Sequence, residues 1–325
     1  MPSKTAHTYS RRTFLLGMAA LGLAGLFPAR SAMAFPGYHE TSLFMGTIVR
    51  IDIASCPVSL GQDACAAAFA EGKHLEALLT RHNACSPLGV LNSQGSLSDV
   101  PQELLGLLDL SADVHAISGG AFDPTILPVL LALENGSVSK AELLKLRSKI
   151  GFSRMQRGSR IRLQDGMAVT LDGIAKGYIA QCMSDVLTRA GCASHIVNAG
   201  GDIVARGLSY ASKPWRVAIE DPAKQGRYPS VLHMSNRSLA TSGTYERTYS
   251  GGNGSHLVDP ARDGRLLTSS VSVLAPQGAQ ADALATAFSV MDPRLSLAAA
   301  QRLPGVDAFI VLADGSTCKT AGWPA

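Results

Sequence analysis

The sequence predicts an α+β domain in which mixed or antiparallel sheets are surrounded by helices. The chain has 325 residues, 46% of them apolar, which is enough to bury a sizeable core and excludes a disordered chain. Helical and strand-like patterns occur in both halves, without the strict strand–helix alternation of a doubly wound parallel sheet. We find no internal repeat, charge block or linker, so we expect one compact domain.

The first half of the chain contains more helix than strand. Residues 41–53 alternate in polarity in the manner of a strand. Pro101 opens a helix, because proline is favoured in a first turn, and Gly119-Gly120 ends it. Further helices are predicted over residues 62–80, 139–149 and 175–189.

The second half is richer in strand. Residues 160–163 and 168–171 flank Gln164-Asp165-Gly166, which predicts a hairpin. Strands are then predicted over residues 195–197, 215–219, 231–234, 238–241, 270–274 and 306–312, and helices over 280–291 and 295–302.

The first 34 residues are typical of an export signal. Arg11 and Arg12 precede an apolar stretch that reaches Phe27, and Ala32-Met33-Ala34 is a small-x-small cleavage signal. We therefore expect a twin-arginine signal peptide over residues 1–34 and a mature domain over residues 35–325 in the bacterial periplasm. An uncleaved signal anchor that retains the protein at the membrane is the alternative. No later segment approaches 18 uninterrupted apolar residues, so no span is expected in the mature protein.

The positive net charge belongs to this signal. Residues 1–34 hold Lys4, Arg11, Arg12 and Arg30 and no acidic residue, which leaves 25 basic and 25 acidic residues in the rest of the chain. A neutral body lacks the basic surface that nucleic-acid binding requires. We therefore expect no nucleic acid among the partners.

Six cysteines remain in the mature chain, and none forms a C-x-x-C pair, which excludes zinc-knuckle and thioredoxin-type sites. An oxidising compartment permits disulfides, but a core of this size does not need them. Cys182 and Cys192 lie in apolar surroundings and are expected to be buried thiols. The six are Cys56, Cys65, Cys85, Cys182, Cys192 and Cys318.

Loops of small residues stand at the junctions between predicted elements. Residues 171–178 join a strand to a helix, and their glycines and outward-facing amides, with Lys176, suit a phosphate. A tight turn with an exposed lysine is the alternative. Residues 198–202 and 120–125 form two similar loops, the first of which could equally be a strand-ending turn with an Asx hydrogen bond.

Two positions carry candidate chemistry. Asp282 and Thr286 lie one turn apart on one helix face, where their oxygens, with phosphates and a backbone carbonyl, suit Mg²⁺. The alternative is that Asp282 is merely stabilised by the helix dipole near the N-terminus of the helix, and that Thr286 bonds back to a carbonyl.

His256, in a Gly-rich loop before Asp259-Pro260, is a candidate general base, and a merely solvated histidine is its alternative. Conventional Rossmann, P-loop, zincin and α/β-hydrolase signatures are absent.

Taken together and in order, seven segments resemble the ApbE family of FAD:protein FMN transferases. The resemblance extends over nearly the whole mature chain. The segments are residues 45–47, 120–124, 173–178, 198–202, 240–246, 255–260 and 281–286.

The resemblance implies a reaction and a site. FMN would pass from FAD to a Thr or Ser hydroxyl of a target protein, in the envelope and with Mg²⁺, and AMP would be released. His256 would take the proton of the hydroxyl. The flavin-adenine site would be lined by Met45, Ala121, Phe122 and Asp123, with Asp172 and Lys176 near the dinucleotide, and the metal would be held by the Gly173 carbonyl, Asp282 and Thr286.

The chain departs from the usual family pattern at three places, one of which is Thr244, where an acid is frequent after Ser242-Gly243. Thr170-Leu171-Asp172-Gly173 stands where the family usually has Asp-Leu-Gly-Gly, so the first acid is lost and Asp172 is gained. Asp172 is therefore the rival of His256 for the role of general base. Arg81 begins a polar segment where an aromatic residue is common. The variant is similar to the NosX-like branch associated with nitrous oxide reductase maturation, which suggests an envelope redox subunit as target. An FAD pyrophosphatase and a non-catalytic flavin carrier or maturation factor remain as alternatives.

Overall fold

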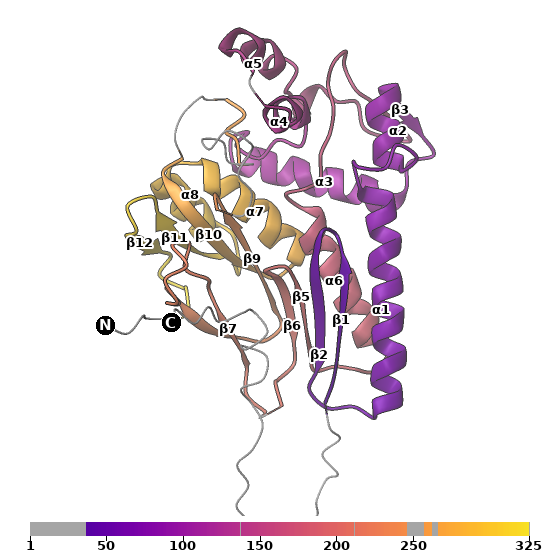
Figure 1. The fold of residues 1–325 in the computed structure, drawn as a ribbon, viewed down its shortest axis with the longest axis vertical. Coiled ribbons are helices and arrows are strands. Elements are labelled where there is room, and N and C mark those ends of the chain that lie inside the picture. The colour runs from indigo at the N-terminus through magenta and orange to yellow at the C-terminus, as the bar shows by residue number, and fades with distance from the viewer. Residues whose placement is uncertain (1–36, 137, 211, 246–256, 262–265, 325) are drawn as a thin grey trace, which may run out of the picture. The chain divides into compact units, whose positions relative to one another are not determined.

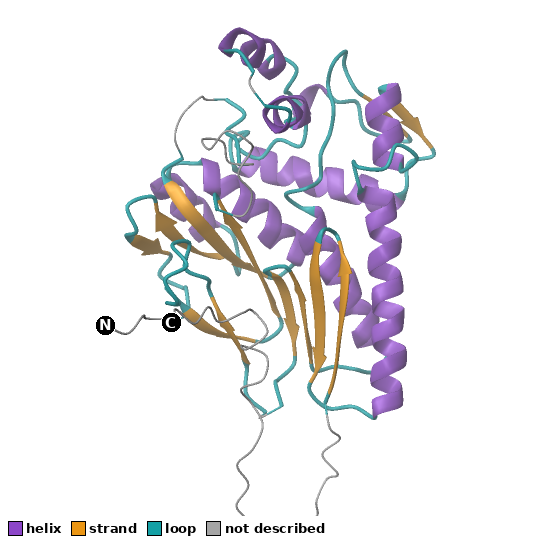
Figure 2. Cartoon of the chain, in the orientation of Figure 1, coloured by secondary structure: helices purple, strands orange, loops and turns teal. Residues whose placement is uncertain are grey.

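Eight strands form one antiparallel sheet in a computed structural model that describes residues 37–136, 138–210, 212–245, 257–261 and 266–324 (Figures 1 and 2). Every neighbouring pair in this sheet is antiparallel. The predicted signal peptide and His256 lie outside the described residues. In spatial order the strands are β1 (Tyr38–Phe44), β2 (Thr47–Ile53), β5 (His195–Ala199), β6 (Asp202–Arg206), β9 (Arg237–Gly243), β10 (Thr268–Ala275), β11 (Asp307–Leu312) and β12 (Thr317–Lys319).

Three helices cover one face of the sheet and form the main core with it (Figure 1). They are α1 (Val58–Leu79), α6 (Ala175–Arg189) and α7 (Gly278–Val290). Val49 and Ile51 of β2 are fully buried beneath them, as are Ile179 of α6 and Phe288 of α7. Small residues on α7 allow it to lie close to both the sheet and α6.

The opposite face is covered by a short hairpin of β7 (Trp215–Ala218) and β8 (Val231–Met234). Trp215 and Trp323 pack there against side chains of β6, β9, β10 and β11. β6 is therefore buried on both faces, which explains why its sequence lacks the alternation of a half-exposed strand.

Most of the remaining elements lie at one end of this body, whereas α8 (Pro293–Arg302) packs against β11 and α7. The elements at this end are α2 (Pro87–Gln94), β3 (Ser96–Ser98), α3 (Gln102–Ile117), α4 (Leu127–Glu134), α5 (Lys140–Arg147), β4 (Arg160–Arg162) and the 3₁₀ helix η2 (Phe152–Arg154). A third apolar cluster joins Ile126, Val129 and Leu130 to side chains of α5 and to Val258.

The α+β class is confirmed, and α6 has the predicted bounds. The prediction of a single strand over residues 41–53 is wrong. Met45 and Gly46 have positive φ values of 54° and 67°, so a two-residue turn divides the segment into β1 and β2. Methionine rarely adopts this conformation, so position 45 lacks the residue types by which a turn is predicted from sequence.

The predicted pairing of residues 160–163 with 168–171 is also wrong. Gly166 does form a turn, with a φ of 72°, but β4 pairs with β3. Residues 168–171 find partners elsewhere: the N–H of Val169 bonds Asn92, and the N–H of Thr170 bonds the Pro124 carbonyl. The α2 and α4 helices and β12 were not predicted. None of the helices within the described ranges is long and apolar enough to cross a bilayer.

All six cysteines are free thiols. Cys192 is buried as expected, whereas Cys182 is only partly buried. Burial raises the pKa of Cys182 to about 11, so it stays protonated at neutral pH.

A fully buried histidine makes the stability of the fold depend on pH. His195 has Nε2 2.7 Å from Oγ of Ser184 and Nδ1 2.6 Å from the Cys192 carbonyl oxygen, and burial lowers its pKa. The unfolded chain keeps the ordinary pKa of about 6.5. Below that value the unfolded state binds a proton that the folded state binds less readily, so stability falls as the pH falls.

We therefore expect the melting temperature to decrease when the pH is lowered from 7.5 to 5.5. The substitution His195→Gln should make this decrease smaller and should also lower the stability at pH 7.5. Thermal melts of both proteins at both pH values measure the effect. An unchanged pH dependence in the variant would assign it to other groups.

Candidate functional site

The site is built where α6 and α7 approach each other through glycine. A Cβ added to Gly278 would lie 2.2 Å from the carbonyl oxygen of Gly177, and one added to Gly177 would lie 2.2 Å from that of Gly278. No larger residue fits either position without separating the helices. The crossing lies within the first turns of both helices, so their unsatisfied N–H groups lie close together.

Each helix satisfies a free N–H at the start of the other. Oδ2 of Asp282 accepts the N–H of Gly177 at 2.9 Å, and Oε1 of Gln181 accepts the N–H of Gly278 at 3.3 Å. Asp282 is only 3% exposed, so its carboxylate is buried at the N-terminus of α6, where the helix dipole is positive.

Three further oxygens gather one turn along α7. Oγ1 of Thr286 lies 3.4 Å from the Gly173 carbonyl oxygen and 3.4 Å from Oγ of Ser242. A Cβ at Gly173 would come within 2.8 Å of Thr286 Oγ1, so the carbonyl reaches this position only because residue 173 is glycine. The threonine does interact with a carbonyl, as the alternative interpretation expected, but with one from another segment.

These oxygens fit a hard cation. Asp282 and Thr286 share one face of α7, and the Gly173 carbonyl faces the same position. Carboxylate, hydroxyl and carbonyl oxygens suit Mg²⁺, which usually completes its shell with water and substrate phosphates. Within the described ranges no group of three or more His, Cys, Asp or Glu side chains is placed to hold a metal.

Lys176, the second residue of α6, stands beside this position. Its Nζ forms an ion pair with Oδ2 of Asp202, whose side chain is buried. Asp202 follows the tight β5–β6 turn, in which Gly201 donates its N–H to Oδ1 of Asn198. The predicted Asx hydrogen bond is therefore present, and the turn fixes a counter-ion for the lysine.

The β1–β2 turn lies against the β5–β6 turn. A Cβ on Gly200 would lie 2.3 Å from Oγ1 of Thr47, the residue that follows the β1–β2 turn. Met45 donates its N–H to Oε1 of Glu76 on α1 at 2.8 Å, which holds the tip of the hairpin. Its side chain is partly buried against the main core.

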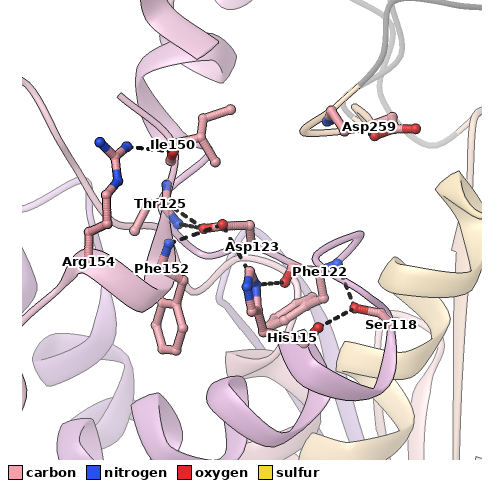
Figure 3. A network of polar contacts seen from close by, with 11 residues as sticks. His115, Ser118, Phe122, Asp123, Thr125, Ile150, Phe152, Arg154 and Asp259 are labelled. Carbon is pink, nitrogen blue, oxygen red and sulfur yellow. Dashed lines mark hydrogen bonds and ion pairs between the residues drawn. The ribbon is translucent and has the colours of Figure 1, made fainter. Parts of the chain in front are cut away.

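Residues 118–125, which follow α3, form a hydrogen-bonded loop (Figure 3). Oδ1 of Asp123 accepts the N–H of Thr125 at 2.8 Å and its hydroxyl at 2.5 Å, and Oδ2 accepts the N–H of Phe152 at 3.2 Å. Nδ1 of His115 lies 3.7 Å from the same carboxylate and 2.9 Å from the Phe122 carbonyl oxygen. Asp123 thus shapes the loop with its carboxylate, and both it and Phe122 are buried, whereas Ala121 is partly exposed.

An arginine joins this region to the start of α6. Nε of Arg81 bonds Oδ2 of Asp172 at 2.8 Å, and its Nη2 bonds Oε1 of Glu134 at 2.7 Å. The guanidinium side chain is 5% exposed; burial opposes its charge, but the two carboxylates raise the pKa of Arg81 overall. Arg81 and Asp172, which belong to two of the departures from the family pattern, are therefore partners.

The segment that follows His256 is anchored by α5. Nη1 of Arg147 donates to the carbonyl oxygens of Asp259 and Pro260, at 2.5 and 2.8 Å. Leu257 is buried and Val258 packs against the α4–α5 cluster. The chain is therefore fixed on the C-terminal side of the predicted base.

Comparison with known proteins shows the family of the chain. The family model of the ApbE family matches residues 45–310. The chain belongs to the ApbE family. A FAD:protein FMN transferase of Treponema pallidum is 30% identical over 88% of this chain and 87% of its own length. One of Rhodobacter capsulatus is 32% identical over 86% of this chain and 56% of its own length. An ApbE protein of Thermotoga maritima has the same fold, with a TM-score of 0.80 and 23% identity over 88% of this chain and 97% of its own.

The fold thus brings together half of the ten residues that the ApbE resemblance singled out. Gly173, Lys176, Asp282 and Thr286 converge at the start of α6, and Asp172 stands beside them. Ser242, Asp202 and Arg81 were not predicted as site residues. Ser242 and Asp202 lay in quoted motifs, whereas nothing local marks Arg81 as a partner of Asp172. The roles of Met45, Ala121, Phe122, Asp123 and His256 in binding and catalysis stay predictions.

The glycine crossing yields a test of how the site is built. Gly278→Ala would press a methyl group against the Gly177 carbonyl, so we expect a loss of about 1–3 kcal/mol of stability, as for overpacking, together with reduced activity. Gly106→Ala on α3 is the matched control, because its Cβ meets nothing within 4 Å and alanine favours a helix. Equal stability of both variants in urea would contradict this account of the crossing.

Proposed function

We propose that this chain transfers FMN from FAD to a Thr or Ser hydroxyl of a target protein, in a Mg²⁺-dependent reaction that releases AMP. The observation that carries the proposal is the convergence of Lys176, Asp282, Thr286 and the Gly173 carbonyl at the start of α6. Membership of the ApbE family supports the same activity, since the curated relatives are FAD:protein FMN transferases.

The arrangement suits a pyrophosphate. The start of α6 carries positive partial charge, and Lys176 adds a full charge that Asp202 keeps in place. Asp282, Thr286 and the Gly173 carbonyl would hold the cation. When bound, Mg²⁺ would neutralise phosphate charge and make the phosphorus a better electrophile.

Transfer also requires an activated acceptor. The hydroxyl oxygen attacks the FMN phosphorus, the bond to the AMP oxygen breaks, and the hydroxyl proton is taken by a base. We assign that role to His256 from the family resemblance. The anchoring of residues 257–260 by Arg147 supports a defined path for the chain beside it.

Two other activities could use the same site. Water in place of the protein hydroxyl would give an FAD pyrophosphatase, and binding without reaction would give a flavin carrier. Incubation of the full chain with FAD, Mg²⁺ and candidate exported redox subunits distinguishes them. Covalent flavin on a subunit supports transfer, free FMN with AMP supports hydrolysis, and unchanged FAD supports a carrier.

We further propose that the protein works in the periplasm after twin-arginine export, on an envelope redox subunit. Arg11, Arg12 and the small-x-small site support this location. Changing both arginines to lysine is expected to leave the precursor in the cytoplasm, as measured by fractionation. Normal export of that variant would contradict the route.

A further inference from the structure

The register of two neighbouring strands brings two cysteines to the same end of the sheet. β2 and β5 pair with Ile53 opposite His195, and the N–H of Ala54 continues the ladder to the Ser194 carbonyl at 2.9 Å. Cys56 and Cys192 lie two positions beyond Ala54 and Ser194, outside the strands, where the same register would bring them opposite each other. Opposed Cα atoms of antiparallel strands lie about 4.5–5.5 Å apart, within the range that a disulfide spans.

The two thiols are close together and shielded from solvent. The side chains of Cys192 and Cys56 are near enough to interact with each other. The residues are 1% and 3% exposed. Gly61 leaves little room for another rotamer, because a Cβ there would lie 2.9 Å from Sγ of Cys56.

We propose that Cys56 and Cys192 form an intramolecular disulfide, which ties the start of α1 to the start of β5. The oxidant is a disulfide-bearing compound. The thiolate of one cysteine attacks a sulfur of that compound and releases one thiol. The second thiolate attacks the mixed disulfide at the protein sulfur, so that one protein S–S bond forms and a second thiol leaves.

The other cysteines are less well placed. Cys65 on α1 is buried and is close enough to interact electrostatically with both thiols, so it is the competing partner, but it has no opposed position in the ladder. Cys182 lies on α6 and is close to Tyr178 instead. Burial raises the pKa of Cys56 and Cys192, so thiolate is scarce in the folded protein and we expect the bond to form mainly during folding or local opening.

The bond would stabilise the body without touching the site. Met45 and Gly200 lie at one end of β2 and β5, whereas Cys56 and Cys192 lie beyond the other, and β2 alone is about 20 Å long at 3.3 Å per residue. A cross-link between residues so far apart in the sequence restricts the unfolded chain strongly. We therefore expect a higher melting temperature and an unchanged affinity for FAD.

Refolding the full chain from urea with glutathione disulfide tests the proposal. Free thiols are then blocked with N-ethylmaleimide, and the protein is digested and mapped by mass spectrometry. We expect a linked peptide pair containing Cys56 and Cys192, and a melting temperature several degrees above that of the reduced protein. Linkage of Cys56 to Cys65, or six blocked thiols after refolding, would overturn the proposal.

Two matched variants complete the experiment. Cys192→Ala should abolish both the linked peptide and the difference in melting temperature, whereas Cys318→Ala, in the partly buried β12, should keep both. If Cys192→Ala does not fold, the peptide map of the unsubstituted protein still decides the pairing. FAD binding by the oxidised and reduced forms should agree within about twofold, because the bond lies at the far end of the strands.

Discussion

Asp282→Asn is expected to abolish Mg²⁺-dependent FMN transfer while leaving the fold intact. The asparagine side-chain oxygen can still accept the N–H of Gly177, so the start of α6 stays capped. The negative charge is lost, however, and the carboxylate is the strongest of the three proposed metal ligands. The other two are the Thr286 hydroxyl and the Gly173 carbonyl. We expect a loss of about a hundredfold or more in transfer, measured as covalent flavin on the target across a range of Mg²⁺ concentrations.

Two companions separate the metal role from the structural role. Asp282→Ala loses the cap as well as the charge, so it should lose transfer and also about 1 kcal/mol of stability. Asp292→Asn changes another helix-capping carboxylate, which bonds the N–H of Arg294 at the start of α8 and should leave transfer unchanged. If Asp282→Asn keeps full activity with the same Mg²⁺ dependence, the metal binds elsewhere.

His256→Asn is expected to slow transfer by at least about a hundredfold, because removal of a general base typically costs 10²–10⁴ in rate. FAD binding should change little, since the proposed role concerns the acceptor hydroxyl. A contact made only with the bound substrate would appear mainly in KM instead. Single-turnover transfer at saturating FAD, with FAD affinity measured separately, gives both quantities.

Asp172→Asn is the comparison that decides between the two candidate bases. Asp172 is about half exposed, and its carboxylate is already bonded to the buried guanidinium of Arg81. That ion pair favours a role in holding the turn before Gly173, and we expect a smaller loss of transfer than for His256→Asn. If only the Asp172 variant is crippled with its metal still bound, histidine is not the base.

Local patterns in the sequence predicted much of the fold and part of the site. The bounds of α6 and the positions of β8, β9, β10 and α7 follow from periodicity and turn residues over a few positions. The shared face of Asp282 and Thr286 also follows from spacing alone, because a helix brings residues four apart to one side. Because these patterns extend over only a few positions, they could not predict that β3 pairs with β4, whose residues are more than sixty positions apart in the sequence.

The sequence by itself therefore determined several of the longer elements, the family and the kinds of group that could perform the chemistry. Only the tertiary structure decided their partners: Gly177 for Asp282, Asp202 for Lys176 and Arg81 for Asp172. Each of these contacts joins segments distant in the chain, and each depends on how the buried faces of sheet and helices fit together. Close packing through Gly177 and Gly278 sets that fit, and no local pattern encodes it.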